Sequence, residues 1–236
     1  MTQRHHRIAA LAIVAAGLFA AAAQAGTMQI TVTDKDGKPA QDVVVLVEPA
    51  TKVAPKPSAT PIVIAQENLH YAPFLTLVPV GSTVRFVNRD SYDHHVRSVP
   101  SGPLGSMPSV KNFEYRLDAA GEAPASSDEY KPAAPKGKKP GTTWAEVKLD
   151  QAGPIGLGCH LHSSMRGQIY VSGTAFFAKT DANGVASIDG IPDGTADVGL
   201  WHPDQLQEQA PLRVQVGTAP AKAVGQLNFT PRRRRG

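Results

Sequence analysis

Cysteine is almost absent from this chain, whose 236 residues contain a single one, Cys159. A disulfide within the chain is therefore excluded, which leaves a buried thiol, an intermolecular bridge or a metal ligand. Aromatic residues make up 6 % and charged residues only 19 %, but 42 % of the residues are hydrophobic. This hydrophobic content argues against a chain that is disordered throughout.

Uninterrupted helical segments are also lacking, because 21 glycines and 20 prolines are spread along the chain. These two residues are the least favourable ones in a helix interior. The composition therefore predicts an all-β fold, and the length suits one large or two small domains.

The N-terminus has the three parts of a secretory signal. A basic head at residues 4–7 precedes an apolar run at 8–23, and Ala23-Gln24-Ala25 forms a small-x-small cleavage site. No later apolar run approaches the ~20 residues needed to span a membrane. We therefore predict a signal peptide at 1–25 and export, to the periplasm if the source is bacterial, with no membrane span after cleavage.

The charge pattern argues against a nucleic-acid partner. The formal net charge of +4 includes the arginines of the leader and the run Arg232–Arg235, so the remaining body is slightly negative. A nucleic-acid-binding surface needs a basic patch with aromatic residues among the positive charges. We expect the basic tail, residues 231–236, to be solvated.

Donor side chains that suit a soft metal gather around the single cysteine. His162 and Met165 follow Cys159 at intervals of three residues. Thiolate, imidazole and thioether are donors that favour copper over hard cations. The β-prone segments 144–149 and 168–171 flank them, so the donors are predicted to lie in a loop at one end of a sheet.

A second imidazole is expected from a segment further upstream. Residues 82–88 alternate as a strand, and the pair His94-His95 follows. Neighbouring side chains in an extended segment point to opposite faces, so one of these two histidines faces the metal. Two imidazoles and a thiolate with a weak axial Met are typical of blue copper, whereas zinc favours four comparable ligands.

In order and spacing this pattern resembles the cupredoxin (type 1 blue copper) family. The run Cys-x-x-His-x-x-Met-Arg-Gly-x-Ile-x-Val is similar to the short ligand loop of amicyanin, and Val-x-Phe-x-Asn before His-His-Val resembles plastocyanin and amicyanin. The resemblance covers about residues 62–172 and implies a Greek-key β-sandwich that holds one type 1 copper. It implies His94, Cys159, His162 and Met165 as the metal ligands.

Two positions depart from the family pattern. The residue after the first ligand is usually an Asn that ties the ligand loops together, and here it is His95. Position 160 is also a histidine, so His95 and His160 are alternative ligands or contacts for a second metal. Asn88, six residues before His94, is expected to support the ligands from the end of its strand.

Outside the copper segment, turn signals separate further strands. Residues 28–32 and 42–47 predict a hairpin, and 175–179, 185–191 and 196–201 predict three more strands. Their turns resemble those of carboxypeptidase-regulatory-like (transthyretin-like) sandwiches.

Because these stretches lie on both sides of the copper segment, we expect an inserted domain. A cupredoxin-like domain at 62–172 would interrupt a second small sandwich built from 27–60 plus 173–230. The alternative is one cupredoxin enlarged by edge strands. Residues 49–61 are predicted to be a linker, and 119–142 a surface loop.

The resemblance implies electron transfer rather than enzymatic catalysis. We expect an exported blue-copper carrier that cycles between Cu(II) and Cu(I) and meets a periplasmic redox partner such as a c-type cytochrome or an oxidoreductase. Leu161, with Met107 or Leu104, is expected to form an apolar docking patch beside His162.

Other functions stay open. The spare histidines suggest a copper-sequestering or copper-delivery module that carries no electrons. A Cys–His nucleophile pair is weaker, because no oxyanion-type loop accompanies it. The remaining alternative is a β-sandwich protein that binds no metal.

Overall fold

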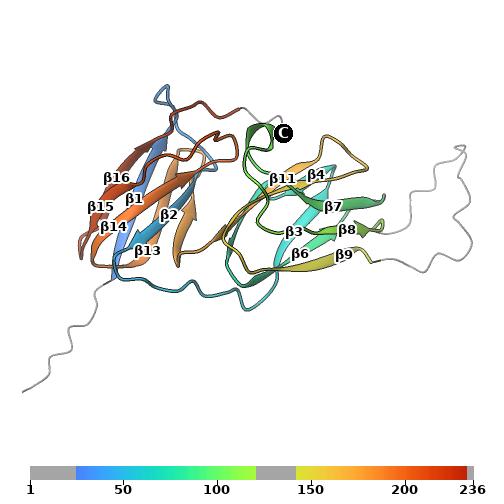
Figure 1. Cartoon of the computed structure of the whole chain (residues 1–236), viewed down its shortest axis with the longest axis horizontal. Coiled ribbons are helices and arrows are strands. Elements are labelled where there is room, and N and C mark those ends of the chain that lie inside the picture. Colours follow the sequence, from blue (N-terminus) through green and yellow to red (C-terminus); the bar gives the residue numbers. More distant parts are fainter. Residues whose placement is uncertain (1–24, 121–141, 233–236) are drawn as a thin grey trace, which may run out of the picture.

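The computed structural model describes residues 25–120 and 142–232, shown in colour in Figure 1. Within these two ranges the chain forms sixteen strands and one 3-10 turn, η1 (Pro103–Gly105), and it has no α-helix. The predicted all-β fold is confirmed. Among the same residues, no helix is long and apolar enough to cross a membrane. The predicted signal peptide, apart from Ala25, and most of the predicted loop at 119–142 lie outside the described residues.

Two facing sheets enclose a core formed from both ends of the described chain (Figure 1). In the first sheet, β1 (Ala25–Thr33) lies between β13 (Val185–Pro192) and β16 (Ala221–Gln226). The second sheet has the order β12 (Phe176–Lys179), β2 (Val44–Pro49), β14 (Gly194–Trp201) and β15 (Leu212–Val216). Fully buried aliphatic side chains from both sheets meet between them, among them Ile30, Val45 and Val198.

The predicted hairpin between the first two strands is wrong, because β1 and β2 lie in opposite sheets. Only an isolated bridge between Thr33 and Pro39 links the two segments, and Asp42 then takes a positive φ of 60°. Alternation shows which side chains are buried, but it does not identify the neighbouring strand. Here both apolar faces are buried across the core from each other rather than side by side.

A second pair of sheets encloses a separate core. One sheet has the order β4 (His70–Ala72), β3 (Ile62–Glu67), β6 (Ser82–Asn88) and β9 (Trp144–Leu149). The other has the order β5 (Leu75–Pro79), β11 (Arg166–Ser172), β10 (Gly153–Gly158), β7 (His94–Val99) and β8 (Glu114–Leu117). Phe86, Leu117 and Ile169 are among the fully buried side chains, and Cys159 and Met165 belong to the same cluster.

The two pairs of sheets pack against each other through a small third cluster. Val44, Leu75 and Trp201 form its buried centre. Trp201 donates its indole N–H to the sulfur of Met107 at 3.3 Å and packs on Tyr170, with 4.9 Å between ring centroids. The hydrophobic run at 43–47 follows from this arrangement, because β2 is covered on both faces.

The described chain therefore has one core from its outer segments and one from residues 62–171, with no strand between residues 50 and 61. The domain assignment and the resemblance of the outer sheets to carboxypeptidase-regulatory-like sandwiches stay predictions.

Candidate metal centre

Strand pairing brings distant donor residues to one end of the second pair of sheets. β10 runs antiparallel to β7, and Gly158 pairs with Arg97. Cys159, which follows β10 directly, is therefore placed beside the beginning of β7, where His94 is the first residue. The chain turns between Cys159 and β11, and this turn carries His162.

Three donor atoms converge at this point. Nδ1 of His94 lies 3.9 Å from the Cys159 sulfur, and Nδ1 of His162 lies 3.7 Å from it. The two imidazole nitrogens are 3.1 Å apart. Among the residues described, these three side chains are the group of His, Cys, Asp and Glu donors whose ligand atoms all lie within 4.8 Å of one another.

The triangle fits a single transition-metal ion. Metal–nitrogen bonds of about 2.0 Å and a metal–sulfur bond of about 2.3 Å, arranged in a plane, put nitrogen and sulfur roughly 3.8 Å apart. The two N–S distances of 3.9 and 3.7 Å match this value. One soft thiolate with two imidazoles is also a donor set that suits copper. The residues present therefore fit the copper that the sequence predicts.

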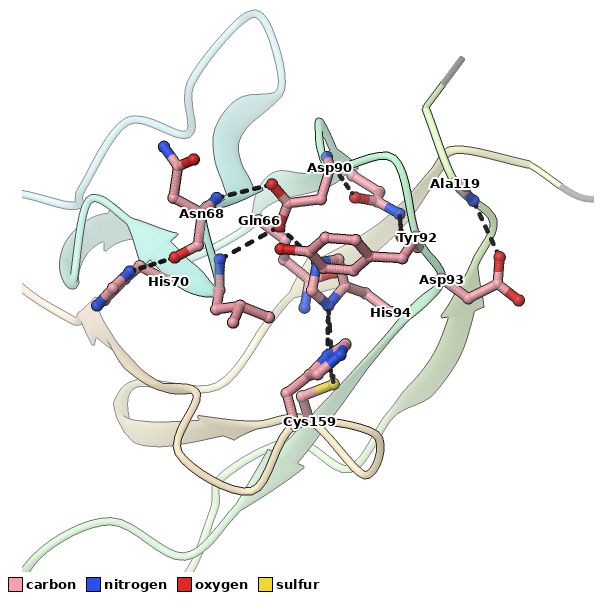
Figure 2. A network of polar contacts seen from close by, with 12 residues as sticks. Gln66, Asn68, His70, Asp90, Tyr92, Asp93, His94, Ala119 and Cys159 are labelled. Atoms are coloured by element: carbon pink, nitrogen blue, oxygen red, sulfur yellow. Dashed lines mark hydrogen bonds and ion pairs between the residues drawn. The ribbon is translucent and has the colours of Figure 1, made fainter. Parts of the chain in front are cut away.

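An aspartate orients the His94 ring from behind (Figure 2). Nε2 of His94 lies 2.8 Å from Oδ2 of Asp90, and both side chains are buried. Because the carboxylate accepts the Nε2 proton, Nδ1 is left with its lone pair toward Cys159.

Backbone amides keep this carboxylate charged. Burial raises the pKa of Asp90, but hydrogen bonds from His94 and from the amides of Asn68 and Leu69 outweigh it and lower the pKa below its usual value. The carboxylate therefore remains available as an acceptor for the His94 proton at neutral pH.

An exposed aromatic ring covers both histidines. The Tyr92 ring stands edge-on to His94 and His162, with centroid distances of 5.2 and 5.4 Å. Burial and the neighbouring His94 lower the pKa of His162, so that this imidazole is neutral and can offer a lone pair. His162 is half-buried, whereas His94 is fully buried, so His162 is the donor nearer to solvent.

The predicted axial residue, Met165, is buried in the same loop. Its side chain is 1 % exposed, and its N–H donates to the His162 carbonyl at 3.0 Å. Its role as a ligand stays a prediction. Below the loop, the Tyr71 hydroxyl donates to the Gly158 carbonyl at 2.8 Å.

The two spare histidines face away from the three donor atoms. His95 donates its backbone N–H to the Cys159 sulfur at 3.4 Å, but its ring lies beside Glu114. His160 also approaches Glu114, at 3.2 Å. His95 therefore supports the thiolate through its backbone, at the position where the family pattern has Asn.

Asn88 acts on the loop rather than on the donors. Its amide nitrogen donates to the carbonyls of Tyr92 and Asp118, both at 2.8 Å, and its oxygen accepts the N–H of Asp90 at 2.9 Å. Asn88 thus fixes the turn that carries Asp90. Sequence reasoning missed Asp90 and Tyr92; an acidic residue four positions before a predicted ligand histidine was the available signal.

Two leucines expected in a docking patch are exposed, and the patch itself stays a prediction. Leu161 is 52 % exposed next to His162, and Leu104 is fully exposed. Met107 is not part of this surface, because Trp201 holds it in the cluster between the two pairs of sheets.

No protein-family model and no curated protein sequence matches the chain. The structural neighbours are cupredoxins, as the ligand pattern suggests. A methionine-to-alanine mutant of amicyanin in its Cu(I) form is 19 % identical with a TM-score of 0.32, and the alignment covers 56 % of this chain and 99 % of that one. A purple cupredoxin from Nitrosopumilus maritimus is 19 % identical with a TM-score of 0.32, covering 47 % of this chain and 99 % of that one.

A larger neighbour is the Cu-containing nitrite reductase from Thermus scotoductus SA-01. It is 18 % identical with a TM-score of 0.33, over 52 % of this chain and 25 % of that one. The chain therefore matches about a quarter of that protein's length. Because these TM-scores are low, the case for a metal centre rests on the donor triangle.

Proposed function

We propose that the protein is an exported, periplasmic electron carrier that holds one type 1 copper at His94, Cys159, His162 and Met165. The observation that supports this best is the triangle of one sulfur and two Nδ1 atoms, with sides of 3.1, 3.7 and 3.9 Å. It has the size of a metal coordination plane.

Each residue has a separate role in this proposal. Copper supplies one-electron chemistry between Cu(II) and Cu(I). Cys159 provides the thiolate, and His94, held by Asp90, provides a fixed imidazole. The thioether of Met165 is the weak axial donor that tunes the reduction potential.

Electron exchange requires a donor near the surface. His162 is half-buried beside the exposed Leu161 and Tyr92, so a redox partner can approach it there. A small apolar surface of this kind suits brief encounters with a partner such as a c-type cytochrome or an oxidoreductase. No enzymatic activity is part of the proposal.

A copper titration followed by visible absorption tests the copper site. The copper-loaded chain should show an intense thiolate-to-copper band. Cys159→Ala should abolish the band, and His162→Ala should weaken or shift it. His70→Ala is the matched control and should leave the band unchanged, because the exposed His70 ring contacts the Asn68 carbonyl and no donor atom of the triangle. A copper-loaded chain without the band contradicts the proposal.

The second candidate is a copper-sequestering or copper-delivery module, favoured by the surplus histidines beside Glu114. The two candidates differ in kinetics. A carrier exchanges electrons rapidly with a c-type cytochrome, whereas a sequestering module binds copper and exchanges electrons slowly. Stopped-flow mixing of the reduced, copper-loaded chain with oxidised cytochrome separates them.

A further inference from the structure

Beside the donor triangle, three other ligand side chains from three different segments meet. We infer that His95, Glu114 and His160 form a second, surface site for one divalent transition-metal ion of the Zn(II) or Cu(II) kind. This site lies outside the His94–Cys159–His162 triangle and does not depend on copper being bound there.

The strand ladder places two of these ligands on one face. β7 pairs with β8 so that His95 lies opposite Arg116 and Arg97 lies opposite Glu114. His95 and Glu114 are therefore diagonal neighbours, a separation that long side chains bridge. Because side chains alternate along β7, His94 points into the core and His95 points to the opposite face.

The third ligand comes from the loop that follows β10. His160 stands next to Cys159, and its ring is perpendicular to the His95 ring, with 5.7 Å between centroids and an interplanar angle of 89°. The loop thus directs one histidine of the pair at 160 and 162 to each of the two sites.

The distances suit a shared ion. Oε1 of Glu114 lies 3.6 Å from Nδ1 of His95 and 3.2 Å from Nε2 of His160. Ligand atoms that bind one zinc ion at about 2.0–2.2 Å lie roughly 3–3.6 Å apart. Each imidazole is therefore at coordination spacing from the Glu114 oxygen. The three donor atoms do not all lie within 4.8 Å of one another, so the exposed side chains of His160 and Glu114 must turn to close around an ion.

The polar atoms at this site have few competing partners. Nδ1 of His95 is buried and makes no hydrogen bond with any residue that the structure describes. Arg116, two positions along β8 from Glu114, forms its ion pairs with Asp93 and Asp118 instead. The His160 side chain is 44 % exposed and Glu114 is 55 % exposed, so an ion can enter from solvent and both side chains can adjust around it.

Two imidazoles and one carboxylate are donors that zinc and copper share. Three protein ligands at a solvent-exposed position leave room for water or for a ligand from a partner. A divalent ion here would also tether His160, and through it the loop that carries Cys159 and His162.

Equilibrium dialysis against micromolar free Zn²⁺, followed by metal analysis, tests the site without copper. Zinc can enter both sites, so the result is read from the differences between variants. Ions held elsewhere on the chain count equally in every variant. We expect the double variant Glu114→Gln/His160→Ala to bind one ion fewer than the unchanged chain. Cys159→Ala should also bind one ion fewer, because it removes the thiolate of the other site.

Two further variants separate ligation from general effects. His95→Ala keeps the backbone N–H that faces Cys159, so it should lose only the second ion. His70→Ala should bind as much zinc as the unchanged chain. Circular dichroism checks that each variant is folded. The inference is overturned if Glu114→Gln/His160→Ala retains the full amount of zinc, or if it loses the ion of the Cys159 site as well.

Discussion

Asp90 holds His94 through a 2.8 Å contact between its Oδ2 and the Nε2 of the imidazole, and this contact decides which ring nitrogen faces Cys159. The carboxylate is itself held by two backbone amides and by the turn that Asn88 closes. Several residues of the loop between β6 and β7 therefore fix the position of the buried imidazole together.

Asp90→Asn should weaken copper binding by about 10- to 100-fold, the usual effect of removing a hydrogen bond to a ligand histidine. The amide keeps the size of the side chain but is a weaker acceptor for the Nε2 proton. Competition with a chelator of known affinity measures the change. Asp150→Asn is the control, because Asp150 pairs with Lys111 on the surface. Equal copper affinities in the two variants would show that Asp90 does not position His94.

Met165 gives a prediction about the reduction potential. Met165→Leu removes the thioether while keeping a similar volume, and it should raise the potential, since Cu(II) loses a donor. Met165→Gln introduces an oxygen donor, which favours Cu(II), and should lower the potential. Voltammetry of both copper-loaded variants checks the two opposite directions. If both potentials shift the same way or neither moves, Met165 is not the axial donor.

Strands with regular alternation could be predicted from the sequence. The segments 82–88 and 144–149 coincide with β6 and β9, because their buried side chains recur at every second residue. The same alternation predicts that His94 and His95 face opposite ways, and the structure places them so. These features depend only on residues that are close in sequence.

Features that depend on pairing between distant segments could not be predicted. The predicted hairpin at residues 28–47 was wrong, because the alternation of apolar and polar residues in β1 is compatible with a neighbouring strand in either of the two facing sheets. Glu114 was not recognised, because β8 is short and its nearness to His160 arises from the order of β10, β7 and β8 in the sheet. The role of Asp90 depends on hydrogen bonds within a turn, and no local sequence pattern predicts these hydrogen bonds.

Substitution of Gly167 is expected to destabilise the protein, because Gly167 packs directly on Tyr71 below the ligand loop. A Cβ at position 167 would lie 2.8–2.9 Å from atoms of the Tyr71 side chain, which is closer than side chains approach. Gly167→Ala should therefore destabilise the fold by about 1–3 kcal/mol through overpacking. The displaced Tyr71 would also loosen its hydrogen bond to Gly158, next to Cys159.

Thermal unfolding of Gly167→Ala and Gly199→Ala gives the comparison. Gly199 lies in β14, where a Cβ would meet its nearest neighbours at 3.9–4.0 Å, an ordinary contact. Its substitution should leave the midpoint almost unchanged. A Gly167→Ala chain as stable as Gly199→Ala would mean that β11 and the Tyr71 side chain can move apart without cost.

Tyr170 reports on the contact between the two pairs of sheets at high pH. Burial, together with the charges of Glu208 and Glu48, raises the pKa of Tyr170 from 10.0 to about 12. The folded state thus keeps its phenol protonated where the unfolded chain already loses the proton. The contribution of Tyr170 to the free energy of unfolding should be fully present below the ordinary pKa and should decline as the pH rises from about 10 towards 12.

Tyr170→Phe should remove this part of the decline, because phenylalanine carries no ionisable group. Urea unfolding of both chains between neutral pH and pH 12 measures the difference, and the phenolate absorbance of the folded chains shows whether the late-titrating component disappears in the variant. If the two stability curves stay parallel over this range, the Tyr170 hydroxyl is not buried against Trp201, and the contact between the sheets is looser than its 4.9 Å ring separation indicates.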